Sequence, residues 1–217
     1  MKNWLILTYT IFAFITILLG YTISYFNDRE ISRGNTIQVS SSWKNTGLLI
    51  NEVLYNPVED DNYNEWIELY NPTNNSIDVN NWTIEDNNSQ DTIEGDNING
   101  NGSTIIPPNG YAILADKGTK VYENFSIPAD VVKLCVDDYS IGNNLGNTED
   151  KLILKNATGA IVDAIEWGSD YSDVPGSPIP NVNQGHSIAR YTNVDTDNTL
   201  ADFYDENNPT PGSENIV

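Results

Sequence analysis

The sequence predicts an all-β domain, a two-layered β-sandwich, preceded by a single N-terminal transmembrane helix. Three observations support this prediction: residues 4–26 carry no charged side chain, the later chain consists of short apolar runs separated by Asn, Asp, Gly and Pro, and no segment after residue 47 has the periodicity of an amphipathic helix. The 217 residues accordingly divide into a transmembrane signal anchor over 1–26, a polar linker over 27–46 and a β-sandwich domain over 47–217.

The first segment has the length and composition of a membrane span. A helix needs roughly 20 apolar residues to cross the hydrocarbon core, and the uncharged run over 4–26 meets that requirement with aromatic residues at both ends, as at membrane interfaces. A cleaved signal peptide is the alternative, but its apolar core is usually only ~7–15 residues long. We therefore expect an uncleaved, single-pass anchor in the cell membrane.

The charge of the chain predicts the side on which the domain lies. Four of the ten basic residues and two of the 31 acidic residues precede residue 47, so the domain carries a net charge of −23. Nucleic acid is disfavoured as a partner, including chromatin, because binding phosphates requires clustered Lys and Arg. We expect the domain to face outward and to contact other envelope proteins or surface glycans.

Six N-x-S/T triplets fit the same external placement, because such triplets accept N-linked glycans on exported chains. In an Asn-rich chain they also arise by chance. The candidate acceptors are Asn74, Asn81, Asn87, Asn101, Asn124 and Asn156.

The strands are predicted from runs rich in Ile, Val, Leu, Trp and Tyr. The runs cover 48–55, 65–70, 77–85, 103–106, 110–115, 131–136, 151–155, 160–167 and 186–191. Alternation is clear in 151–155, where Leu152 and Leu154 share one face and Lys151, Ile153 and Lys155 share the other. Many short strands separated by turn residues are typical of a sandwich, and no internal repeat is visible.

The order of motifs along the domain resembles that of lamin tail domains. The motifs are INEV at 50–53, EWIELYNP at 65–72, PPNGYAIL at 107–114, GHSIAR at 185–190 and PTPG at 209–212. The resemblance implies an immunoglobulin-like β-sandwich of the prokaryotic, membrane-anchored type, with a binding or structural role and no catalysis. No heptad-repeat rod precedes the domain and the chain has no room for a fused enzyme domain, so neither filament assembly nor nuclease activity is implied.

Glu52 and Glu68 are candidate catalytic residues, because each interrupts an apolar strand. Paired carboxylates divide acid and base roles in hydrolases, so a small envelope hydrolase is the alternative function. The structural interpretation, which we prefer, is that each carboxylate accepts backbone N–H bonds, with Arg190 as a further partner, since buried charge must be compensated. Carboxylates that face an open cleft would favour the enzyme, and capped carboxylates the module.

The remaining reactive or aromatic residues are interpreted structurally. The single histidine, His186, is predicted to be a surface or structural strand residue, since no nucleophile-elbow motif accompanies it. The single cysteine, Cys135, is predicted to be a core thiol. Trp66, Trp82 and Trp167 lie in strand runs and are expected to pack in the core rather than to form a carbohydrate platform. Trp43 lies in the linker.

No cofactor is predicted, but two acidic segments carry the oxygen ligands that Ca²⁺ prefers. The first contains Asp60, Asp61 and Asn62, and the second contains Asp195, Asp197 and Glu206. The second resembles an EF-hand loop in spacing, but Leu200 occupies the position that requires glycine. Asp and Asn also suit turn geometry, so both segments have a purely structural interpretation.

Overall fold

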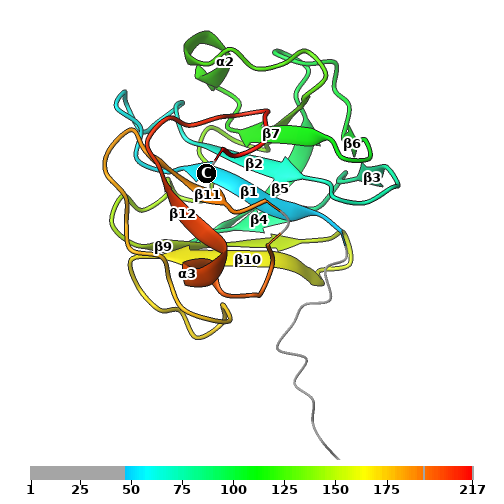
Figure 1. Cartoon of the computed structure of the whole chain (residues 1–217). Coiled ribbons are helices and arrows are strands. Elements are labelled where there is room, and N and C mark those ends of the chain that lie inside the picture. The colour runs from blue at the N-terminus through cyan, green and yellow to red at the C-terminus, as the bar shows by residue number, and fades with distance from the viewer. Residues whose placement is uncertain (1–46, 193, 217) are drawn as a thin grey trace, which may run out of the picture. The chain divides into compact units, whose positions relative to one another are not determined.

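The computed structural model describes residues 47–192 and 194–216 (Figure 1). The predicted anchor over 1–26, the linker over 27–46 and Trp43 lie outside the described residues. A search of the described ranges finds no helix with the length and apolar character that crossing a membrane requires.

The described chain is all-β, which confirms that part of the predicted fold class (Figure 1). The strands are β1 (Leu49–Leu54), β2 (Trp66–Tyr70), β3 (Ile77–Asp78), β4 (Thr83–Glu85), β5 (Gln90–Gly95), β6 (Ile105–Ile106), β7 (Tyr111–Ala115), β8 (Val132–Val136), β9 (Asp150–Lys155), β10 (Ile161–Trp167), β11 (Ser187–Arg190) and β12 (Phe203–Glu206). Two single-turn helices, α2 (Val121–Asn124) and α3 (Thr199–Asp202), lie in connections between strands.

The two layers of the sandwich are parts of one curled sheet, a continuity that the sequence does not predict. The strand order is β10-β9-β4-β5-β8-β7-β2-β1-β11-β12, with β3 and β6 paired separately. Strand β5 joins the layers, because it pairs with β4 on one side and with β8 on the other. All these pairs are antiparallel except β7 with β8, whose connection contains α2.

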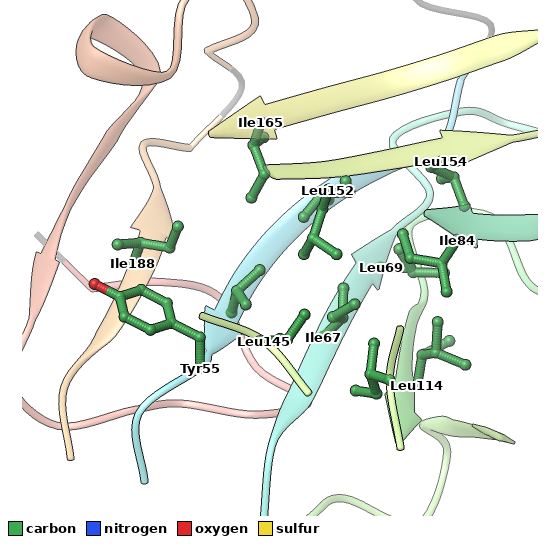
Figure 2. Packing of buried hydrophobic residues seen from close by; sticks show 14 of the residues in the cluster. Tyr55, Ile67, Leu69, Ile84, Leu114, Leu145, Leu152, Leu154, Ile165 and Ile188 are labelled. Atoms are coloured by element: carbon green, nitrogen blue, oxygen red, sulfur yellow. The ribbon is translucent and has the colours of Figure 1, made fainter. Parts of the chain in front are cut away.

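The main core lies between the two layers. Figure 2 shows Leu152, Leu154 and Ile165, from β9 and β10, directed toward Ile67 and Leu69 of β2. These side chains alternate along their strands with residues on the opposite face, as the period of a strand requires. The predicted division of β9 is confirmed, since Leu152 and Leu154 belong to this core and Ile153 belongs to a separate cluster with Ala164 and Val174.

Most predicted runs match strands, and the misses have physical causes. Strand β5 is hidden in the polar sequence QDTIEG, where only Asp91 and Ile93 are buried. The run 77–85 forms two strands, because the chain turns at Asn81, whose φ of 58° is left-handed. Strand β12, which the apolar runs did not include, pairs with β11.

A second cluster covers the outer face of β1, β2 and β7, and Trp66 is its largest member. Trp66 is fully buried against Leu54, Ile113 and Val131, and its ring meets that of Phe125 edge-on at 5.9 Å. Trp167 is also fully buried, stacks on Tyr55 at 4.5 Å in the main core and donates its indole N–H to Gly146. The half-buried Trp82 packs against the same core, so the packing interpretation of the three tryptophans is confirmed.

Replacing Trp66 with alanine should lower the free energy of unfolding by about 3–5 kcal/mol, because the change leaves a cavity beneath α2. The measurement is chemical denaturation of the purified full-length chain followed by circular dichroism. Trp66→Phe should cost much less, since it retains a ring and removes an indole N–H that has no hydrogen-bond partner.

Ile98→Ala is the matched control, because Ile98 is 79% exposed and its truncation should leave the denaturation curve unchanged. A Trp66→Ala variant as stable as the wild-type chain would contradict the packing assigned to this ring.

Candidate functional site

Glu52 and Glu68 lie side by side on neighbouring strands. A β-bulge in β1 between Ile50 and Glu52 brings Glu52 into register with Glu68 of β2. Both side chains are fully buried. The pair therefore faces no open cleft.

Backbone and side-chain donors from the C-terminal segment 207–216 cap both carboxylates. Glu52 accepts hydrogen bonds from the Thr210 backbone N–H at 3.0 Å, the Thr210 hydroxyl at 3.1 Å and the Ser187 hydroxyl. Glu68 accepts the Asn51 amide at 2.6 Å and the backbone N–H of Gly212. Both carboxylates are capped, as the structural interpretation predicts, and this observation supports that interpretation over the hydrolase.

Burial raises the pKa values of both glutamates toward neutral pH. Desolvation raises the pKa of Glu52 to about 7, although hydrogen bonds from Ser187 and Thr210 oppose the shift. Desolvation likewise raises the pKa of Glu68 to about 8, with a further increase from the neighbouring Glu52 charge. The two groups thus hold protons at mildly acidic pH that exposed glutamates would have lost.

Arg190 does not pair with either glutamate, so the predicted role of Arg190 is wrong. Its guanidinium forms a buried ion pair with Asp163 at 2.8 Å and donates a second hydrogen bond to the Ile50 carbonyl at 2.9 Å. Asp163 also accepts the Ile50 N–H at 2.7 Å. Burial raises the pKa of Asp163 to about 6, and the Arg190 charge opposes that shift.

Asn215 completes the arrangement, and sequence reasoning assigned it no role. Its side-chain amide donates to the carbonyls of Asn51 at 3.0 Å and of Arg190 at 2.8 Å. Gly212 in the same segment has a φ of 87°, a conformation that favours glycine. The PTPG motif was the sequence signal for this segment, which the structure shows to be a latch across β1 and β2.

The outer side of this latch forms a small polar pocket of about 160 Å³. Tyr70 and Tyr111 stack there at 4.8 Å, beside Thr192 and Glu214. A wider groove of about 590 Å³ lies between the segments 99–107 and 129–133. These two hollows are candidate places for a ligand on the described surface.

The other reactive residues occupy structural positions. Cys135 is buried in β8, and burial raises the pKa of its thiol to about 11. This confirms the expected core thiol, because a nucleophilic cysteine needs a lowered pKa. His186 immediately precedes β11 and is partly exposed, with its Nδ1 2.7 Å from Asp205.

The first acidic segment docks on the loop between β8 and β9. The Asp61 carboxylate accepts the Asn147 amide at 2.9 Å, and Asn62 accepts the Asn144 amide at 3.2 Å. Asp60 is exposed and accepts the Asn62 amide at 3.2 Å. The segment thus joins two loops at one end of the sandwich.

The second acidic segment is divided among separate partners. Asp195 lies 3.4 Å from Arg190, whereas Glu206, in β12, accepts the Asn208 N–H at 2.8 Å. Asp197 adopts a left-handed φ of 55°. Across 47–192 and 194–216, no group of three or more His, Cys, Asp or Glu side chains could hold a metal ion.

The candidate glycan acceptors lie at the surface of the domain, five exposed and Asn156 half-buried. Asn156 accepts three hydrogen bonds in the turn between β9 and β10, and Asn124 donates to Asn64 at 2.7 Å. Their modification stays a prediction.

Comparison with known proteins identifies one family. A family model described as Lamin Tail Domain matches residues 41–169, which is more than half of the chain. No curated protein matches the sequence.

The stability of the chain should depend on pH through Glu52 and Glu68. In the unfolded chain both carboxyl groups have a pKa near 4.5, and in the folded chain their pKa values are about 7 and about 8. Between about pH 4.5 and pH 8 the folded chain therefore binds more protons than the unfolded chain. The contribution of the two glutamates to the free energy of unfolding is complete below about pH 4.5 and is lost as the pH rises to about 8. The melting temperature of a Glu52→Gln/Glu68→Gln variant should fall less between pH 5 and pH 8 than that of the wild-type chain.

Glu59→Gln serves as the control, because Glu59 is exposed on a nearby loop. It should reproduce the wild-type pH dependence. A double variant whose melting temperature follows the wild-type slope would show that the pair does not titrate in this range.

Proposed function

Because the chain belongs to the lamin tail domain family, we propose that it acts as a membrane-anchored module with a binding or structural role in the cell envelope. Lamin tail domains are immunoglobulin-like β domains that are generally non-enzymatic. The all-β fold described above agrees with that family. The membrane anchor, the prokaryotic type and the external position are the further parts of this proposal.

The observation that carries the non-catalytic role is the capping of Glu52 and Glu68. An acid–base pair needs at least one carboxylate in contact with a substrate or a water molecule. Here Thr210, Ser187, Asn51 and Gly212 occupy those positions. The pair thus holds the C-terminal segment in place and is withdrawn from any ligand.

The proposed partners are other envelope proteins or surface glycans. The net charge of −23 over residues 47–217 opposes nucleic acid and favours cationic or neutral surfaces. The groove between 99–107 and 129–133 offers the exposed Ile105 and Asn101 and the half-buried Lys133 to such a partner. A mixture of apolar and polar groups of this kind suits protein or sugar contacts.

The proposed topology predicts the outcome of protease treatment. Protease added to intact cells should digest residues 47–217 and leave a membrane-bound fragment that contains residues 1–26. A tag at the N-terminus and another at the C-terminus follow the two parts on immunoblots. The C-terminal tag should disappear and the N-terminal tag should stay with the membrane.

Lysed cells provide the control, because protease then reaches both sides of the membrane. Protection of the C-terminal tag in intact cells, with digestion only after lysis, would place the domain inside the cell and overturn the proposed position.

The proposed binding role predicts partners that are cross-linked at the groove. A photo-reactive amino acid placed at Ile105 should give cross-linked products with envelope proteins or glycans in intact cells. The same residue placed at Leu200, which is 53% exposed on α3, is the matched control and should give fewer. Equal patterns at the two positions would count against the groove as the binding face.

A further inference from the structure

Two buried oxygen atoms near the β1–β2 loop have no hydrogen-bond partner. They are Oε1 of Glu65 and Oδ1 of Asn147. Glu65 is only 2% exposed. Leaving a buried acceptor unsatisfied costs about 1–3 kcal/mol, and more when the group is charged, so two in one region require an explanation.

Both oxygens belong to the contact between two loops. The other oxygen of Glu65 accepts the Leu145 N–H at 3.2 Å, and the Asn147 amide donates to Asp61 at 2.9 Å. Asp61 is also the charged neighbour that acts most strongly on Glu65. Glu65, Asn147 and Asp61 thus meet where the segment 59–65 lies against the segment 145–150.

Acidic residues surround Glu65, and burial, together with their charges, raises the pKa of its carboxyl group to about 9. Asp61, Asp116 and Asp150 all act on the charge of Glu65. Among the described residues, the ion pairs involve none of these four carboxylates. In the absence of a cation the Glu65 carboxyl therefore keeps its proton at neutral pH, and a metal ion bound there takes the place of that proton.

We infer that Glu65 Oε1, Asn147 Oδ1 and the Asp61 carboxylate form a Ca²⁺ site that joins the β1–β2 loop to the β8–β9 loop. Ca²⁺ accepts six to eight oxygen ligands in irregular geometry, so water and backbone carbonyls complete its shell. The site has two carboxylates and an amide, and is not a three-acid centre of the kind that the described residues lack. Its dissociation constant should be about 10⁻⁴–10⁻³ M, as in extracellular modules.

The site differs from the acidic segments considered as isolated sequence motifs. Of the residues 60–62, only Asp61 contributes, and its partners come from residue 65 and from a segment about 80 positions later. Such a site depends on the docking of two loops and cannot be recognised from the spacing of acidic residues alone.

Thermal melts of the purified full-length chain test the inference. Calcium chloride from 0.01 to 10 mM, at constant ionic strength, should raise the melting temperature along a saturable curve. At a free Ca²⁺ concentration 100 times the dissociation constant, the folding equilibrium constant should rise about 100-fold. Matched NaCl and MgCl₂ should not reproduce the curve, because Mg²⁺ demands compact octahedral geometry.

Three variants locate the effect. Glu65→Gln should abolish the saturable gain, since its amide can donate to Asn147 Oδ1 in place of a cation. Asn147→Asp should move the midpoint to a lower Ca²⁺ concentration by about tenfold, because a third carboxylate enters the site. Glu59→Gln, an exposed change on the same loop, should behave as wild type.

Several results would overturn the site. They are an equal calcium gain in wild type and Glu65→Gln, a gain reproduced by MgCl₂, or no calcium gain at all. If Glu65→Gln does not fold, the Asn147→Asp variant provides the test. An unchanged midpoint Ca²⁺ concentration in Asn147→Asp would also overturn the site. Loss of the gain in Asp195→Asn, with retention in Glu65→Gln, would move the site to the second acidic segment.

Discussion

The bulge in β1 is the constraint on which the rest of the domain depends. Asn51 is the extra residue and has no register partner in β2 or β11, whereas Ile50 pairs with Leu69 of β2 but with no residue of β11. Asp163 accepts a hydrogen bond from the N–H of Ile50, and Arg190 donates one to the carbonyl of Ile50. Asn215 donates a hydrogen bond to the carbonyl of Asn51. The bulge also sets Glu52 opposite Glu68, so one irregularity in a single strand creates the need for the buried ion pair, the capped carboxylates and the latch.

Acidic residues serve a second structural purpose at the end of the sandwich. Carboxylates of Asp91, Asp86, Glu65 and Asp150 accept successive backbone N–H groups of the β8–β9 loop at residues 142, 143, 145 and 146. The loop has little regular secondary structure, so these bonds replace the ladder that a strand would provide. Part of the negative charge is thus an internal framework, and only the remainder is a solvated surface.

The sequence was sufficient for the fold class, most strands and the main core, because those follow from local periodicity. The alternation in 151–155 correctly assigned Leu152 and Leu154, and the position of Glu52 and Glu68 within apolar runs correctly indicated capping. The partner of Arg190, the continuity of the sheet through β5 and the role of Asn215 were not predictable in this way. Each depends on pairing between residues far apart in sequence, and QDTIEG hides β5 because its inward positions include a hydrogen-bonded Asp91 rather than an apolar side chain.

The C-terminal position of the latch determines when Glu52 and Glu68 can be capped during synthesis. The donors for Glu52 and Glu68 on residues 210 and 212 are made roughly 160 positions after β1, which at ~5–20 residues per second is a delay of roughly ten to thirty seconds. Until then, the two glutamates lie on a face that nothing from the C-terminal segment covers. The nascent domain therefore passes through an interval in which its first two strands present ionisable groups to water, and the last residues to emerge convert that open face into the closed one.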